Sequence, residues 1–115
     1  MVIVFCAGSY TRPHRHLAKS ETFHVIEGEL DVMFFDDHGE PAQVVHMGAW
    51  NTGSAAVYRL ADSRWHTVIP RSEMVVLHEI TNGPFRREDT LYPDWAPRED
   101  DQPSAREYYE RLRSM

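Results

Sequence analysis

The sequence has a single cysteine, fewer basic than acidic residues and no apolar run that approaches the length of a membrane span. The single thiol, Cys6, excludes an internal disulfide framework, and its apolar neighbours Phe5 and Ala7 predict that it is buried and inert. A formal net charge of −6 argues against nonspecific nucleic-acid binding, which needs a basic face. Residues 1–7 also lack the features of a signal peptide. We therefore expect no nucleic-acid partner, no membrane partner and a cytoplasmic protein.

Internal repeats, linkers and low-complexity segments are absent as well, and 115 residues are enough for one domain. The first eighty residues consist of short β segments rich in Val, Ile and Phe, without helical periodicity. The predicted strands are 2–7, 22–27, 30–35, 43–47, 55–60, 67–69 and 74–80. Many short strands with regular turns predict a sandwich or a closed barrel.

The composition changes after residues 82–84, where Pro, Asp, Glu and Arg become frequent. We expect a barrel at 1–82 and, at 83–115, a C-terminal tail and a short helix packed on the same domain. A capping box at 104–107, Ser-Ala-Arg-Glu, predicts this helix at 105–113. The tail is expected to be held on the barrel by its aromatic side chains, Phe85, Tyr92 and Trp95.

Histidine is frequent, with seven residues in the chain. His14 and His16 are separated by one residue, so in an extended segment both point to the same face. Glu21 returns to that face if residues 17–20 bend, and His66 opens a predicted strand after a polar turn. Three imidazoles and one carboxylate suit one divalent ion of Fe, Mn, Zn, Ni or Co. On an octahedral ion, four such ligands leave two positions for water or substrate.

The spacing of these residues matches a known motif. Gly8, five residues, His14-x-His16, four residues, Glu21, six residues and Gly28 reproduce the first cupin motif, G-x5-H-x-H-x3/4-E-x6-G, at every position. The chain therefore resembles the cupin superfamily. This resemblance implies an all-β double-stranded β-helix, or jelly-roll barrel, to which the sequence adds a short C-terminal α-helix.

The second cupin motif, G-x5-P-x-G-x2-H-x3-N, is largely lost. His66 stands in the place of its histidine, but Ala61, Ser63 and Pro70 replace its Pro, second Gly and Asn. The assignment of His66 as the third imidazole ligand therefore depends on its position between turn and strand, and His46 is the alternative.

The chain resembles more narrowly the WbuC-type cupin-fold metalloproteins, which are found in O-antigen and other surface-polysaccharide gene clusters. The resemblance covers nearly the whole chain and rests on four stretches: GSYTRPHRH at 8–16, RWHT at 64–67, GPF at 83–85 and WAP at 95–97. It implies a metal-binding cupin with no assigned reaction. Members of this family usually carry an additional N-terminal segment, which is lacking here, so the sheet edge it would cover is expected to be exposed or paired with a second subunit.

Two further polar residues are candidates for the site. Glu79 shares a face with Leu77, and if that face is the barrel interior its carboxyl group lies near the metal as a candidate catalytic residue. The alternative is a pair with an arginine at the barrel mouth. Arg12 shares the face of His14 and is predicted to bind an anionic substrate, or else is a solvated surface arginine. The apolar walls of the ligand pocket are expected from Phe23, Val25, Val32, Phe34 and Leu77.

Two functional classes follow from this reading. One is a metal-dependent enzyme for a small polar molecule, such as a sugar or sugar nucleotide, with an Fe(II) oxygenase as a subclass. The other is a non-catalytic module that binds a small ligand through the metal, so the sequence leaves open whether the chain is an enzyme. A homodimer is predicted because Val4, Ile26 and Val76 need cover that one barrel interior does not provide.

Overall fold

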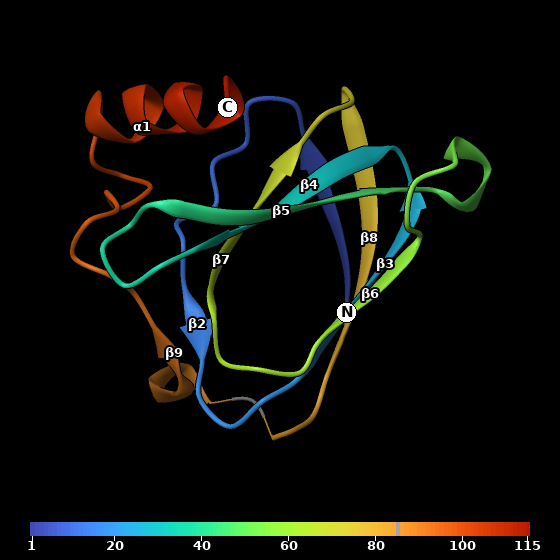
Figure 1. Cartoon of the computed structure of the whole chain (residues 1–115), viewed down its shortest axis with the longest axis horizontal. Helices are drawn as coiled ribbons and strands as arrows, with labels where there is room; N and C mark the ends of the chain where they lie inside the picture. Colours follow the sequence, from blue (N-terminus) through green and yellow to red (C-terminus); the bar gives the residue numbers. More distant parts are fainter. Residues whose placement is uncertain (85) are drawn as a thin grey trace.

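The computed structural model describes residues 1–84 and 86–115, which form mostly β structure (Figure 1). The strands are β1 (Val2–Cys6), β2 (Arg15–His16), β3 (Glu21–Glu27), β4 (Glu29–Phe35), β5 (Pro41–Gly48), β6 (Val57–Leu60), β7 (Trp65–Pro70), β8 (Met74–Thr81) and β9 (Thr90–Leu91). Short 3-10 turns occupy Trp50–Thr52 and Arg87–Asp89, and helix α1 covers Ser104–Arg113. The predicted all-β architecture with a short C-terminal helix is confirmed. None of the helices in the described part of the chain has the length and hydropathy of a membrane span.

The strands form antiparallel sheets with the orders β1-β8-β3-β6, β5-β4-β7 and β2-β9. On β3, Phe23 and Val25 point inward while His24 and Ile26 are exposed, which is the two-residue period of a strand buried on one face. The inner faces of the two larger sheets enclose the main core, which consists of Phe23, Val25, Leu30, Val32, Phe34, Met47, Leu60, Val68, Val75 and Leu77.

Strand β4 is buried on both faces. Its residues Val32 and Phe34 belong to the main core, whereas Met33 and Phe35 point to the opposite face of the sheet. There they form a second apolar cluster with side chains of β7, the tail and α1, namely Ile69, Ala96, Tyr108, Tyr109 and Leu112. Helix α1 therefore covers the outer face of the β5-β4-β7 sheet.

Trp95 of the tail packs against this second cluster. The Trp95 ring lies 5.1 Å from the Phe35 ring and 6.0 Å from the Trp65 ring, centroid to centroid, so Trp95 anchors the tail as predicted. Tyr92 is half exposed and lies beside His14 instead. Phe85, the third aromatic residue expected to hold the tail, lies outside the described residues.

Two local predictions are wrong. Ser104 is the first residue of α1 rather than its N-cap; the N-cap is Pro103, and no side chain caps the helix there. Backbone bonds replace the capping box, because the Ala105 N–H donates to the Asp101 carbonyl oxygen. Cys6 is exposed, because β1 is an edge strand and turns its even-numbered residues to the outside.

The motif glycine Gly28 makes the turn between β3 and β4 with a φ of +88°. A Cβ atom there would lie 2.3 Å from the Met74 carbonyl oxygen, whereas at Gly53, with a φ of +85°, a Cβ atom would meet nothing within 4 Å. We expect Gly53→Ala to cost about 1 kcal/mol of unfolding free energy through backbone strain alone. Gly28→Ala adds the clash and should cost roughly 2–4 kcal/mol. Urea unfolding of both variants measures this difference; equal losses would show that the close approach to β8 does not matter.

Candidate metal centre

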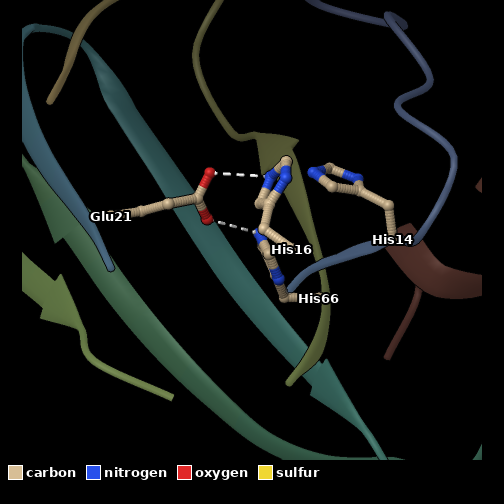
Figure 2. A group of neighbouring side chains, drawn as sticks. All are labelled: His14, His16, Glu21 and His66. Atoms are coloured by element: carbon tan, nitrogen blue, oxygen red, sulfur yellow. Dashed lines mark ion pairs between the residues drawn. The ribbon is translucent and has the colours of Figure 1, made fainter. Parts of the chain in front are cut away.

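Four side chains from distant parts of the sequence meet in one cluster: His14, His16, Glu21 and His66 (Figure 2). One candidate ligand atom from each residue lies within 4.8 Å of the others. His14 precedes β2, His16 lies in β2, Glu21 begins β3 and His66 lies in β7. The structure thus brings together the four residues that the motif and the turn–strand position predict.

The predicted bend at 17–20 is present and explains how Glu21 returns to the histidines. Ala18 adopts a left-handed backbone conformation with a φ of +52°, which few residues other than glycine adopt. The bend is held by the segment after β8: the backbone N–H of Ser20 donates to the Asn82 side chain at 2.8 Å, and the Lys19 amine donates to the Asn82 carbonyl oxygen at 3.2 Å. Two backbone hydrogen bonds of 3.0 and 2.9 Å pair His14 with His66.

The hydrogen-bond partner of each Nδ1 atom determines which nitrogen of that imidazole keeps a free lone pair. His14 Nδ1 lies 2.9 Å from the Arg12 carbonyl oxygen, and His66 Nδ1 lies 2.8 Å from the Arg64 carbonyl oxygen. Because a carbonyl oxygen only accepts, each Nδ1 carries the hydrogen, and in a neutral ring Nε2 is left with a free lone pair. His16 Nδ1 is held at 3.1 Å from the Thr90 hydroxyl group. This is the arrangement in which metal-binding histidines are usually held.

Glu21 lies between two of these imidazoles. Its Oε1 is 2.9 Å from His16 Nε2, and its Oε2 is 3.0 Å from His66 Nε2. These contacts are short, yet His16 Nε2 and Glu21 Oε2 are buried without a hydrogen bond of good geometry among the described residues. Buried polar atoms without partners are rare and costly. A divalent ion that accepts three nitrogens and the carboxylate would satisfy these atoms, so the residues present fit a metal.

The protonation states of His14 and Glu21 also favour cation binding. Burial, with a smaller effect of His66, lowers the pKa of His14 to about 4, so this imidazole is neutral at pH 7. Burial alone would raise the pKa of Glu21, but close contacts with His16, His66 and Glu79 hold it well below its usual range. The pKa of His16 is raised, chiefly by its contact with Glu21. The cluster therefore presents an ionised carboxylate beside a neutral imidazole at pH 7.

Glu79 lies on the inner face of β8, directly opposite Phe23 of β3, as the alternation of the strand predicts. Burial, together with the adjoining carboxylate of Glu21, raises the pKa of Glu79 to about 7. Two neighbouring carboxyl groups of this kind share a proton, because both cannot carry a charge at low cost. Glu79 is thus placed beside the cluster, and its catalytic role stays a prediction.

A cavity of about 240 Å³ adjoins the cluster. It is lined by Ile3, Phe5, Thr11, His14, Glu21, Phe23, His66, Val68, Leu77 and Glu79. Phe23 and Leu77 line it as predicted. Val25, Val32 and Phe34 are not among the lining residues; they are fully buried in the main core, where the Phe34 ring lies 6.2 Å from the His66 ring, centroid to centroid. The alternation of a strand predicts to which face of the sheet a side chain points, but not whether that side chain borders a cavity. Ile3 and Phe5 were missed, although they alternate with Val4.

Arg12 does not line this cavity either. Its guanidinium group donates to the backbone oxygens of Ala96 and Pro93, at 3.1 and 2.8 Å, and lies 5.0 Å from the centre of the Tyr92 ring. These contacts bind the tail to the segment before His14. The expected contact of Arg12 with an anionic substrate is disfavoured by this geometry.

His46, the alternative to His66, interacts with Asp31 and not with the four-residue cluster. Its Nδ1 is 2.5 Å from the carboxylate of Asp31, which also accepts a hydrogen bond of 2.7 Å from Arg71. Asp31 points to the outer face of the β5-β4-β7 sheet, in register with His46. His46 therefore belongs to a separate ion-pair network.

Comparison with known proteins gives a partial family match. The family model for a domain of unknown function, DUF6016, matches residues 1–47. Among curated proteins, none matches.

Comparison with solved structures identifies the fold of this chain. The chain is similar to CapF, a capsular polysaccharide assembling protein from Staphylococcus aureus, with 19% identity, a TM-score of 0.61 and coverage of 80% of this chain and 27% of CapF. It is also similar to CapF with the inhibitor 3-isopropenyl-tropolone, with 18% identity, a TM-score of 0.62 and coverage of 80% of this chain and 27% of that one. A dTDP sugar isomerase from Desulfovibrio desulfuricans G20 matches with 13% identity, a TM-score of 0.66 and coverage of 87% of this chain and 64% of the isomerase. The chain thus spans about a quarter of the length of CapF, and it shares its fold with the matching parts of CapF and of the isomerase.

Proposed function

We propose that this chain is a metal-dependent cupin protein in which His14, His16, Glu21 and His66 hold one divalent ion of Fe, Mn, Zn, Ni or Co. The observation that carries the proposal is the convergence of three imidazoles and one carboxylate, with the Nδ1 atoms of His14 and His66 held by backbone oxygens. When bound, such an ion supplies Lewis-acid polarisation of a ligand oxygen. The chain's own contribution is to hold the donors in place and to exclude water from the buried side of the site.

The carboxyl group of Glu79 is the proposed proton carrier. It lines the cavity beside Glu21 and is not a member of the four-residue cluster. From there it can give a proton to, or take one from, an oxygen or carbon atom of a molecule in the cavity. This makes Glu79 the candidate catalytic residue of an enzyme and a hydrogen-bond partner in a binding module.

The proposed ligand is a small molecule of surface-polysaccharide metabolism, such as a sugar or a sugar nucleotide. Two lines of support exist: the resemblance to WbuC-type cupins and the similarity of fold to CapF and to a dTDP sugar isomerase. A non-catalytic ligand-binding module is the alternative, and iron at the site would favour an Fe(II) oxygenase. A cytoplasmic location suits the free Cys6 thiol, since reducing compartments keep such thiols reduced.

Nuclear magnetic resonance of sugar nucleotides, mixed with metal-loaded and with metal-free protein, tests this function. An enzyme converts the ligand into a product only when loaded, and a binding module broadens its signals without a product. If neither change occurs with any ligand of this class, the assignment to polysaccharide metabolism is wrong.

We further propose a homodimer formed through the outer face of the β1-β8-β3-β6 sheet. Exposed apolar side chains cover this face: Val2, Val4, Ile26, Val57, Met74 and Ile80. Contiguous apolar patches on a surface mark interaction sites. Val4 is 57% exposed, and Val44, on the outer face of β5, is 39% exposed.

Light scattering coupled to size-exclusion chromatography should therefore find a dimer for the parent chain. Val4→Asp should give a monomer, because it buries a charge in the interface. Val44→Asp is the matched control on the other sheet and should stay dimeric. A monomeric parent, or two variants that behave alike, would contradict this interface.

A further inference from the structure

The cavity beside the metal cluster has a mostly apolar lining. Five of its lining side chains form what we call the apolar wall, and they come from four strands: Ile3, Phe5, Phe23, Val68 and Leu77. Ile3 lies opposite Leu77 in the β1–β8 pairing, and Phe23 lies opposite Glu79 in the β3–β8 pairing, so the lining residues of these three strands are neighbours on one sheet. Apart from the cluster residues, the polar lining consists of Thr11 and Glu79.

The size of the cavity limits what enters it. Sites for drug-sized ligands usually measure about 300–1,000 Å³. A cavity of about 240 Å³ lies below this range, so it holds one ring or one short branched chain. The nucleotide part of a sugar nucleotide has no room there and would remain outside.

The chemistry of the wall limits the ligand further. A hydroxyl group placed against the apolar wall loses its water without gaining a partner, which disfavours binding. A hydrocarbon group in the same place gains affinity by about fourfold for each buried CH2. A ligand should thus bind more weakly if the part that lies on the apolar wall carries several hydroxyl groups, and more tightly if this part is a hydrocarbon.

We propose that this cavity selects a compact ligand with a metal-binding polar end and an apolar body. The polar end faces the His–Glu cluster, and the body lies on the apolar wall. This inference rests on the proposed metal site. It narrows the proposed function, because the part of any sugar derivative that enters the cavity must be its deoxygenated or methyl-bearing part.

Three hydroxamates that share one chelating end test the proposal by calorimetry on zinc-loaded protein. Acetohydroxamate has almost no body, 3-methylbutanohydroxamate has an apolar body, and glycerohydroxamate has a hydroxylated body with the same number of heavy atoms. The apolar compound carries three more carbon atoms than acetohydroxamate and should bind roughly 50-fold more tightly. Glycerohydroxamate should bind no more tightly than acetohydroxamate.

A matched pair of variants locates the effect on the wall. Ile3 and Val4 are neighbours on β1 that point to opposite faces. Ile3→Ser should reduce the preference for the apolar compound several-fold, and Val4→Ser should leave it unchanged. The ligand series on the parent chain needs neither variant, so it remains decisive if Ile3→Ser does not fold.

The outcomes separate this inference from the proposed function. If zinc binds and the three hydroxamates bind equally, or the hydroxylated one binds best, the inference about the wall is overturned and the metal site stands. If the parent chain takes up none of Fe, Mn, Zn, Ni or Co, both are overturned.

Discussion

Replacing His66 with alanine should remove most of the stabilisation that metal gives to this protein. At a metal concentration 100 times the dissociation constant, binding stabilises the parent chain by about 2.7 kcal/mol. For a domain of this size that corresponds to a rise in Tm of roughly 10 °C. Removing the hydrogen-bond partner of a metal ligand typically lowers metal affinity by about 10–100-fold. Removing the imidazole ligand itself should lower metal affinity at least as much.

At the same metal concentration, the His66→Ala variant should then gain only about 0.4–1.4 kcal/mol, or roughly 2–6 °C in Tm. Thermal unfolding with and without added metal measures the effect. His46→Ala is the matched control, since His46 is the alternative ligand and pairs with Asp31 instead. An equal metal-dependent shift in His66→Ala and the parent, or its loss in His46→Ala, would reverse the assignment.

Replacing Leu112 with alanine should lower the free energy of unfolding of the whole chain by about 2–5 kcal/mol. Leu112 of α1 is 2% exposed and packs in the second apolar cluster with Met33, Phe35 and Ile69 of the sheet. If residues 83–115 belong to the same domain as the barrel, this loss appears in one cooperative transition.

Chemical unfolding followed by both circular dichroism and tryptophan fluorescence tests this expectation. Arg106→Ala on the exposed side of α1 is the control and should change stability by less than about 0.5 kcal/mol. An early separate transition of the helix in Leu112→Ala, with an unchanged main transition, would show that the barrel at 1–82 folds without its tail.

The sequence predicted the part of the site that depends on short spacing. His14 and His16 share a face because they are two residues apart, and Glu21 follows at the distance of the motif. The spacing also required the bend at 17–20, but not that Ala18 would make it, because alanine is not a residue that indicates a left-handed conformation. Strands β2 and β9, of two residues each, were missed because so short a pairing leaves no periodic pattern.

Burial was predicted less well than the positions of the strands along the chain. β1 is apolar at every position, so its sequence does not show which face is inside, and Cys6 was placed in the core although it is exposed. Val25 and Phe34 point inward as predicted, but whether an inward side chain borders the cavity depends on how the two sheets are stacked. Such long-range geometry leaves no mark on the local sequence pattern.

Metal analysis of protein purified without a histidine tag tests directly whether His14, His16, Glu21 and His66 hold one metal ion. We expect one equivalent of a divalent transition metal per folded chain, and none in the His14→Ala/His66→Ala double variant. A folded parent chain that carries no stoichiometric metal, and takes up none when Fe, Mn, Zn, Ni or Co is supplied, would contradict this expectation.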